Sequence, residues 1–226
     1  YHSDFDSVQK KRNIKPANGY GKAFRTLDTA TIKKRLSSGT SWSRRHYIDL
    51  PDSEQNEDKK YFIDPYIVGC ILGDGSISAG GIGLSISSPY VIDRMISKLK
   101  PGYKITEKTS GRNYEYSLTV DRDSETYKSK NLFKQNNEYI SALRVLDLMG
   151  KTALNKFIPK KYLNGSTEQR LELLRGLMDT DGCVGKDGTL AYSTSSLQLA
   201  KDIQYLIRSL GGLAKIRSKI PFYTYN

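Results

Sequence analysis

The sequence has few of the side chains on which many enzymes depend. Histidine occurs only at His2 and His46, and cysteine only at Cys70 and Cys183, among 226 residues. A catalytic triad, a histidine-based nuclease or a zinc-activated water is difficult to build from this set, and the cysteines lack the paired spacing of a zinc site. We expect both cysteines to be free thiols in a reducing, intracellular compartment.

Long apolar segments are also absent. No stretch approaches the roughly 18 consecutive apolar residues that mark a membrane-spanning helix, and the polar residues 1–15 lack the apolar region of a signal peptide. We therefore expect no membrane partner. The length of 226 residues predicts one large domain or two small ones, and the 37% of apolar residues is typical of a globular chain.

Positive charge is what the sequence has in excess. Lysine and arginine number 36 against 24 aspartates and glutamates, which gives a formal net charge of +12. On a folded chain this charge favours a polyanionic partner, most simply nucleic acid, and hence a location with access to DNA such as the cytoplasm or nucleoid. A basic protein whose charges serve only solvation is the alternative that composition leaves open.

The chain is predicted to have three parts. Residues 1–60 form a peripheral basic segment and linker, because they contain turn formers and charges but no sustained hydrophobic period. Within them, a short helix over residues 30–36 has a candidate cap in Asp28 or Thr29. Residues 61–163 and 164–226 then form two related halves.

Two predicted helices end in the same Asp-Gly dipeptide. The first, in "DPYIVGCILGDG", runs from about Tyr66 to Gly73 with Asp64 as its N-cap, and it is apolar on nearly all sides. The second, in "STEQRLELLRGLMDTDG", spans residues 166–182 and begins with a capping box of Ser166 and Gln169. A helix that is buried all round and then ends in a carboxylate is an unusual placement that requires a reason.

The ends of these helices repeat with a constant offset. Gly69 and Asp74 are five residues apart, as are Gly176 and Asp181, and each member of the second pair lies 107 positions after its counterpart (176 − 69 and 181 − 74). Chance similarity between short amphipathic elements is the alternative explanation. An internal duplication is favoured, because the segments that follow repeat in the same order.

Those following segments predict the architecture of each half. Residues 85–99 and 193–207 both read as a strand end, a serine cap and an amphipathic helix, and residues 103–108 resemble residues 214–219. The first half then adds a closing helix in "NEYISALRVLDLM". Each half thus reads as a helix, strands, a second helix, further strands and a closing helix, which predicts an α+β fold whose halves are related by a pseudo-two-fold axis.

The duplication explains the buried helix and its terminal carboxylate. If the two helices pack against each other, Gly69 and Gly176 allow close approach, and the helix ends bring Asp74 and Asp181 together. Two neighbouring carboxylates repel each other unless a cation lies between them. Oxygen ligands of this kind suit Mg²⁺, and with a basic surface nearby they indicate chemistry on a phosphodiester.

The strands supply a basic, hydroxyl-bearing face, because alternate side chains of a strand share one side. The residues predicted to contact nucleic acid are Lys104, Thr106 and Lys108 in the first half and Lys215, Arg217 and Lys219 in the second. Tyr114 and Tyr116 alternate with Glu115 and Ser117 and are expected to join this face.

The two motifs resemble a known family. "YIVGCILGDG" and "LLRGLMDTDG" look like the paired dodecapeptide motifs of LAGLIDADG homing endonucleases in their single-chain form. "NKFIPKKYL" resembles the lysine-containing block before the second motif in endonucleases carried within inteins. The resemblance covers roughly residues 64 to 219. It implies a monomer made of two pseudo-symmetric αββαββα halves. Their saddle-shaped sheets would bind a long double-stranded DNA site, and the protein would cleave both strands with Mg²⁺.

The resemblance also implies roles for particular residues. Asp74 and Asp181 match the catalytic, metal-binding acids, and the carbonyl groups of Gly73 and Thr180 stand where the family supplies backbone ligands. Lys156, in "KFIP", matches a lysine that stabilises charge on the phosphate or tunes the attacking water. A surface lysine with no catalytic role is the alternative for Lys156.

Residues 1–60 resemble the connector between the splicing domain of an intein and its nuclease, which implies fusion in cis to a splicing domain and a host protein. We do not expect this chain itself to splice, because position 1 is neither Cys nor Ser and Tyr225 stands where a histidine usually precedes the final asparagine. The block around Lys156 has no counterpart after Asp181, so the second half is expected to be incomplete.

Two competing functions belong to other classes. A catalytically silent LAGLIDADG protein that binds DNA or RNA, a maturase or a regulator, would keep the fold, but binding alone does not need both Asp74 and Asp181. A glycosidase-like pair of carboxylates would not need the positive charge. A magnesium-dependent DNA endonuclease is therefore the preferred hypothesis.

Overall fold

The computed structural model describes residues 28–37, 50–78, 81–108, 113–125 and 137–219. The chain divides into two compact units, residues 1–49 and 50–226. The described element of the first unit is helix α2 (Thr29–Ser37), which agrees with the helix predicted there. Asp28 caps it, since its carboxylate accepts a hydrogen bond from the Thr31 amide at 2.8 Å.

Residues 50–60 belong to the second unit, which begins at Leu50 rather than at residue 61. The Glu54 amide donates to the Ser209 carbonyl at 2.8 Å, and the Lys59 amide donates to Gln169 Oε1 at 3.0 Å. The buried guanidinium of Arg170 also donates to the Glu54 carbonyl. The residues of this linker are mostly exposed, but hydrogen bonds of its backbone attach it to the folded unit.

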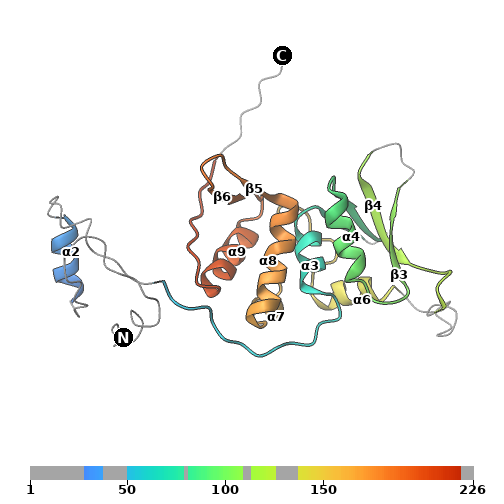
Figure 1. Cartoon of the computed structure of the whole chain (residues 1–226), viewed down its shortest axis with the longest axis horizontal. Helices are drawn as coiled ribbons and strands as arrows, with labels where there is room; N and C mark the ends of the chain where they lie inside the picture. The colour runs from blue at the N-terminus through green and yellow to red at the C-terminus, as the bar shows by residue number, and fades with distance from the viewer. Residues whose placement is uncertain (1–27, 38–49, 79–80, 109–112, 126–136, 220–226) are drawn as a thin grey trace, which may run out of the picture. The chain divides into compact units, whose positions relative to one another are not determined.

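The first half has the predicted αββαββα order (Figure 1). Its elements are α3 (Pro65–Leu72), β1 (Gly75–Ser78), β2 (Gly81–Ser85), α4 (Pro89–Ser97), β3 (Tyr103–Glu107), β4 (Glu115–Val120) and α6 (Glu138–Val145). The four strands form one antiparallel sheet in the order β1-β2-β4-β3. Helices with antiparallel sheets confirm the predicted α+β class.

The second half repeats the first part of this order. After the short α7 (Lys160–Leu163) it contains α8 (Thr167–Asp181), β5 (Gly182–Val184), β6 (Leu190–Tyr192) and α9 (Leu197–Ser209). The strand predicted over residues 214–219 is wrong, because the structure gives residues 212–219 no regular secondary structure. A strand requires a hydrogen-bonded neighbour, and none pairs with this segment within the described part of the chain.

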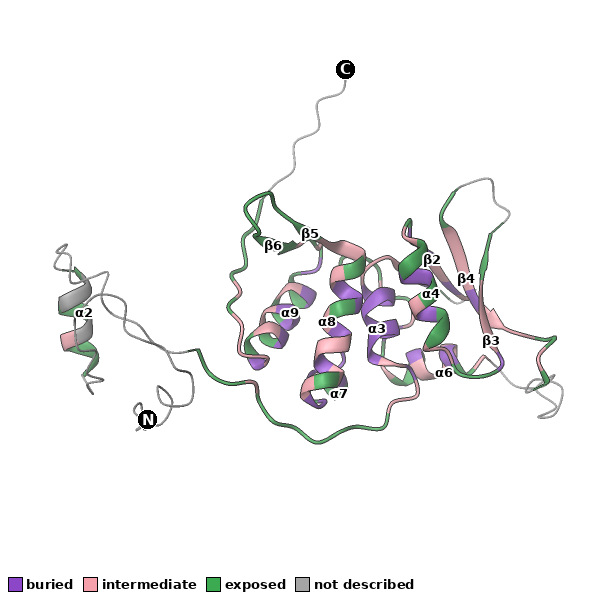
Figure 2. Cartoon of the chain, viewed as in Figure 1, coloured by how far each residue is buried: buried purple, intermediate pink, exposed green. Residues whose placement is uncertain are grey.

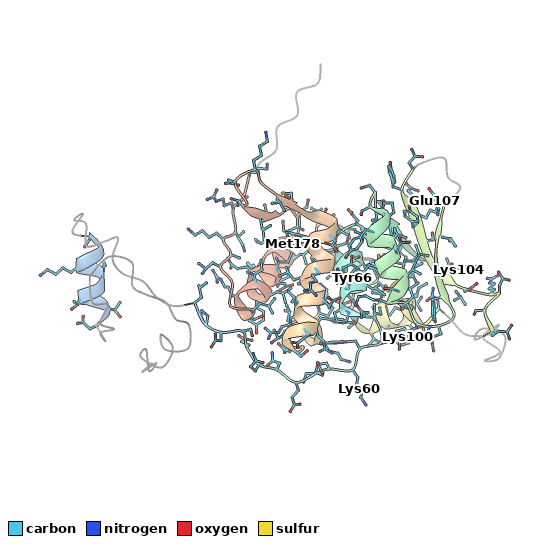
Figure 3. All side chains as sticks on the ribbon, in the orientation of Figure 1. Lys60, Tyr66, Lys100, Lys104, Glu107 and Met178 are labelled. Carbon is cyan, nitrogen blue, oxygen red and sulfur yellow. The ribbon has the colours of Figure 1, made fainter. Side chains whose placement is uncertain are left out.

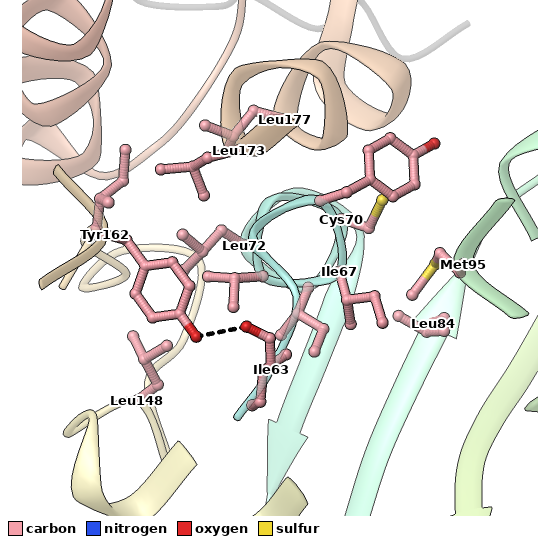
Figure 4. Close-up of a cluster of buried hydrophobic side chains, with 14 of the residues drawn as sticks. Ile63, Ile67, Cys70, Leu72, Leu84, Met95, Leu148, Tyr162, Leu173 and Leu177 are labelled. Carbon is pink, nitrogen blue, oxygen red and sulfur yellow. Dashed lines mark hydrogen bonds between the residues drawn. The ribbon is translucent and has the colours of Figure 1, made fainter. Parts of the chain in front are cut away.

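Helix α3 forms the centre of the core, and all eight of its residues are buried (Figure 2). Asp64 caps its N-terminus by accepting from the Tyr66 amide at 2.8 Å, as predicted. The first sheet packs on one side of the helix and α8 on the other (Figure 4). Buried side chains around α3 include Leu84, Met95, Leu148, Tyr162, Leu173 and Leu177.

The two halves bury their equivalent hairpins to very different extents. Ile77 and Ile82, paired between β1 and β2, are 5% and 2% exposed, whereas Val184 and Leu190, paired between β5 and β6, are 70% and 68% exposed. In the first half β4 continues the sheet. In the described second half the sheet has only two strands, so the apolar side of that hairpin stays open.

None of the helices in the described ranges has the length and apolar character to cross a bilayer. Both cysteines are free thiols, with Cys70 buried in α3 and Cys183 exposed on β5. Burial raises the pKa of Cys70 to about 12. Cys70 is thus a core side chain rather than a reactive thiol.

Candidate active site

Helices α3 and α8 touch backbone to backbone at two glycines. A Cβ atom on Gly69 would lie 2.9 Å from the Cα of Gly176 and 2.8 Å from the amide nitrogen of Leu177. A Cβ atom on Gly176 would lie 3.0 Å from the amide nitrogen of Cys70. No larger side chain fits at either position, so the structure places both glycines at the helix contact for which the sequence proposed them.

The same contact aligns the ends of the helices. Asp181 is the last residue of α8, and Asp74 follows α3 after the single residue Gly73. The Ser85 amide donates to the Asp74 carbonyl at 3.1 Å, and the Ser193 amide donates to the Asp181 carbonyl at 3.4 Å. The hairpin that follows each helix therefore holds each aspartate in the same way.

The two carboxylates lie within electrostatic reach of each other. Burial raises the pKa of Asp74, and the negative charge of Asp181 raises it further. Burial also raises the pKa of Asp181, while the positive charge of Lys156 counteracts the shift at both positions. The structure thus brings Asp74, Asp181 and Lys156 into one half-buried cluster.

Lys156 is buried, with 6% of its surface exposed. Its ammonium group donates to the carbonyl oxygens of Ile71, Gly73 and Gly75 at 3.1, 2.8 and 2.7 Å. A lysine has three N–H groups, and here each has an acceptor. The ammonium caps the negative end of α3, and the alternative of a surface lysine does not hold.

The second half fixes the backbone around this lysine. Ser196, the N-cap of α9, donates its hydroxyl to the Lys156 carbonyl at 2.7 Å, and Asp202 on α9 accepts from the Ile158 amide at 2.9 Å. Sequence reasoning missed both contacts. The helix-capping serine was visible in the sequence, but its second partner, 40 residues earlier, was not.

Tyr192, at the end of β6, is a further residue of this cluster that sequence reasoning missed. Its hydroxyl is buried and has no hydrogen-bond partner among the residues that the structure describes. Burial and the charges of Asp181 and Asp74 raise the pKa of Tyr192. The only signal in the sequence was its position directly before Ser193, in the hairpin that follows the second motif.

One face of the first sheet carries small and hydroxyl-bearing residues. Lys104 pairs with Thr119, and Thr106 pairs with Ser117, so these side chains share the face turned away from the core. Lys108 follows β3 on the same side, and a Cβ atom on Gly83 would lie 3.2 Å from its Nζ. Lys104 also forms an ion pair with Asp121 at 2.9 Å and lies on the strand pair farther from α8 (Figure 3).

The two tyrosines proposed for this face lie elsewhere. Tyr116 pairs with Leu84 and Glu107, which places it on the core side of the sheet together with Leu118. Tyr114 precedes β4 in a turn with a φ of 68°. The predicted sharing of a face by the tyrosines and lysines is wrong, because the strand register sets the opposite alternation.

The basic residues proposed in the second half are exposed but do not form a strand face. Lys215, Arg217 and Lys219 all lie in the irregular segment after α9. Gln204 holds the start of this segment by donating to the Ala214 carbonyl at 3.1 Å. Their positive charge is accessible, whereas the alternating geometry predicted for them is not formed.

The chemistry of the cluster fits a hard divalent cation. Both half-buried carboxylates have a raised pKa, a state that a bound cation relieves, and oxygen ligands are those that Mg²⁺ prefers. No group of three or more His, Cys, Asp or Glu side chains gathers in the described ranges. Backbone carbonyl groups, water or phosphate oxygens would have to complete the coordination around Asp74 and Asp181.

Comparison with known proteins identifies a family to which the second half is similar. Residues 168–225 match a family model described as a LAGLIDADG-like domain. The match includes Asp181 and confirms the resemblance seen in the second motif.

Three curated relatives match most of the chain. A replicative DNA helicase DnaB from Mycobacterium intracellulare is 33% identical over 186 residues, which make up 82% of this chain and 24% of that protein. DnaB from Synechocystis is 25% identical over 84% of this chain and 23% of its own length. The ribonucleoside-diphosphate reductase NrdEB subunit alpha from Bacillus subtilis is 24% identical over 68% of this chain and 15% of its own length. The chain thus spans about a quarter or less of these relatives.

Proposed function

We propose that the protein is a site-specific homing endonuclease, because residues 168–225 match a family model described as a LAGLIDADG-like domain. It would bind a long double-stranded DNA site and hydrolyse phosphodiester bonds on both strands with Mg²⁺. The observation that carries this proposal is the meeting of Asp74 and Asp181 at the ends of two helices in backbone contact. A protein that only binds nucleic acid has no use for two mutually repelling carboxylates.

The proposed roles follow from the positions of the side chains. Asp74 and Asp181 would hold the cation, and the Thr180 carbonyl would be a further ligand beside the contact between α3 and α8. The Gly73 carbonyl already accepts from Lys156, so its role as a ligand would be shared with the ammonium. A bound divalent cation supplies polarisation of the phosphate and a more acidic attacking water.

Lys156 would act through its charge. All three of its N–H groups are occupied by carbonyl oxygens, so it is not free to donate to a phosphate in this arrangement. Its positive charge beside Asp74 and Asp181 keeps both carboxylates closer to their ionised form. It would also hold the turn that carries Asp74, which makes it a positioning residue for the metal site.

The outer face of the first sheet is the proposed DNA-binding surface. The small side chains of Ser76, Gly83 and Ser117 are neighbours across three strands, and they let a phosphate backbone approach closely. Lys108 extends over this surface. Lys215, Arg217 and Lys219 add positive charge in the second half, and the net charge of +12 supports long-range attraction of DNA.

The pattern of relatives supports an origin within an intein. Most of this chain matches less than a quarter of a DnaB helicase and less than a quarter of a reductase subunit, two proteins whose names indicate unrelated activities. A segment shared by such proteins behaves as a module inserted into different hosts. We infer that the nuclease is encoded within such an element and is fused in cis to a host protein.

A plasmid library with a randomised insert, sequenced at its cut ends, tests the function and identifies the target sequence in the same experiment. The full-length protein should cut both strands at one long sequence in Mg²⁺ and should not cut in EDTA. Asp74→Asn and Asp181→Asn should each lower the cleavage rate on the order of 10²–10³-fold, since a metal contributes several kcal/mol to the barrier. The exposed Asp93→Asn on α4 is the matched control.

The outcome distinguishes this function from the silent binding protein. If the aspartate variants bind the selected DNA as the wild type does but no longer cut it, the assignment of both residues stands. If the wild type binds one sequence tightly and never cuts it in Mg²⁺, the protein is a DNA-binding descendant of the family. Equal cleavage by the wild type and either aspartate variant would refute the active-site assignment.

A further inference from the structure

The buried hydroxyl of Tyr192 is unexplained by the proposed roles of the cluster. A buried hydroxyl without a partner destabilises a protein by about 1–3 kcal/mol. The Tyr192 hydroxyl is buried and forms no hydrogen bond of normal geometry with the residues that the structure describes. A phenylalanine would fill the same space without this penalty. The hydroxyl therefore needs a reason outside packing.

Its surroundings identify the group that it serves. Tyr192 pairs with Gly182, the residue directly after Asp181, and the next residue, Ser193, donates to the Asp181 carbonyl. Burial raises the pKa of Tyr192, the charges of the Asp181 and Asp74 carboxylates raise it further, and a hydrogen-bonding contribution from the Asp181 carboxylate adds to the shift. The phenol thus lies close enough to the Asp181 carboxylate to lower the pKa of that carboxyl by hydrogen bonding, yet the two groups do not form a hydrogen bond of normal geometry.

The first half has no hydroxyl at the equivalent pairing position. The residue that pairs with Gly75 after Asp74 is Leu84, which is 2% exposed and belongs to the core. On that side Lys156 supports the turn through three carbonyl groups. The two repeats therefore support their aspartates by different means, a lysine behind Asp74 and a tyrosine against Asp181.

We propose that Tyr192 is a positioning residue that donates a hydrogen bond to the Asp181 carboxylate when that carboxylate holds a divalent cation. This inference rests on the proposed endonuclease function. A carboxylate that binds a metal with one oxygen is commonly held by a hydrogen bond to the other, and loss of such a partner typically weakens metal binding 10- to 100-fold. In that state the hydroxyl has an acceptor of normal geometry, which it lacks here.

Tyr192→Phe removes only the hydroxyl, and Tyr205→Phe is the matched control because Tyr205 lies on α9 with its hydroxyl directed to Glu54. The unfolding temperature of each full-length protein is measured without metal and over a series of Mg²⁺ concentrations, since a ligand that binds the native state raises that temperature. The Mg²⁺ concentration for half-maximal cleavage of the selected DNA is measured in parallel.

Tyr192→Phe should need at least about 10-fold more Mg²⁺ than the wild type, both to raise its unfolding temperature and to reach half-maximal cleavage. Without metal, its unfolding temperature should equal or exceed that of the wild type. Tyr205→Phe should match the wild type in Mg²⁺ dependence. Identical Mg²⁺ dependence of wild type and Tyr192→Phe overturns this inference and leaves the endonuclease intact. A wild type that neither gains stability from Mg²⁺ nor cleaves overturns both.

Discussion

Gly73 and Thr180 occupy equivalent positions in the two repeats and lie against each other where α3 and α8 meet, a contact that we call the seam. A Cβ atom on Gly73 would lie 2.8 Å from the Cβ of Thr180. The Thr180 hydroxyl donates to the carbonyl oxygens of Gly176 and Leu177 at 3.0 and 2.9 Å, which keeps its side chain against its own helix. The small residue in one repeat makes room for the larger one in the other. The seam is therefore asymmetric immediately beside the two aspartates.

Gly69→Leu places a whole side chain where the backbones of α3 and α8 touch. Overpacking of a dense core typically costs about 1–3 kcal/mol, so the free energy of unfolding should fall by that amount. The change should also separate Asp74 from Asp181, and a displacement of about 1 Å at a catalytic group costs on the order of 10²-fold in rate. Denaturant titration and cleavage kinetics measure the two effects.

The control for this variant is Asp93→Leu, which adds the same side chain on the exposed face of α4. It should leave cleavage near the wild-type rate. A stable Gly69→Leu protein that cuts as fast as the wild type would contradict the role of the seam in placing the carboxylates.

Lys156→Met removes the cation that satisfies three carbonyl groups at the end of α3. Leaving buried polar groups without partners costs about 1–3 kcal/mol, so stability and cleavage should fall together. Lys160→Met, at an exposed lysine on α7, should change neither. A lysine that acts only on the substrate would instead lose cleavage with an unchanged free energy of unfolding, and that result would reject the structural role.

Lys108→Ala tests the DNA-binding face of the first sheet. Removal of one phosphate contact should weaken binding and reduce the slope of log K against log salt by about 1. Lys60→Ala, an exposed lysine on the segment 50–60 (Figure 3), is the control and should keep the wild-type slope. Fluorescence anisotropy with the selected DNA measures the affinity and the salt slope of each variant between 50 and 200 mM salt. Over this range, roughly 6–10 phosphate contacts change the affinity by about 10³–10⁵.

The salt experiment also tests DNA as the partner. A nearly flat salt dependence for the wild-type protein would mean that the lysines only solvate the sheet. An equal slope for Lys108→Ala and the wild type would move the contact surface away from the face that carries Gly83.

Glu172 on α8 joins the two halves through charge. It accepts from Arg94 at 2.9 Å, pairs with Lys98 at 2.8 Å and accepts from Arg175 at 2.6 Å. Burial by itself would raise the pKa of Glu172, but the hydrogen bonds from Lys98 and Arg175 and the charges of Lys98 and Arg94 outweigh it and lower the pKa to about 2. The ionised form is therefore favoured in the folded state.

The sign of this shift predicts a pH dependence. A lowered carboxyl pKa contributes stability in full above the ordinary value of 4.5, and the contribution is lost as the pH falls towards about 2. Glu172→Gln should be less stable than the wild type at pH 7, on the order of 1 kcal/mol for a partly exposed ion pair, with a difference that shrinks below pH 4.5. Glu107→Gln, on β3, should track the wild type throughout. A difference for Glu172→Gln that stays constant with pH would assign the effect to packing.

The sequence was sufficient to predict helices α3 and α8 and their relationship as two copies of one repeat. Asp64 and Ser166 are caps whose partners lie two or three residues away, and such local hydrogen bonds can be read without a fold. The equal spacing of Gly69–Asp74 and Gly176–Asp181 records the duplication, and close helix packing requires residues without side chains at fixed helical positions. The α+β class and the site of the two carboxylates follow from these signals.

Only the tertiary structure decided how the other side chains are used. Tyr116 faces the core because the pairing of β4 with β2 sets its alternation, and a shift of one residue would reverse it. The site of the Lys156 ammonium depends on three carbonyl groups more than 80 residues away, and Tyr192 reaches Asp181 through the pairing of β5 with β6. These placements rest on long-range pairing of backbone groups, whose partners no local sequence signal specifies.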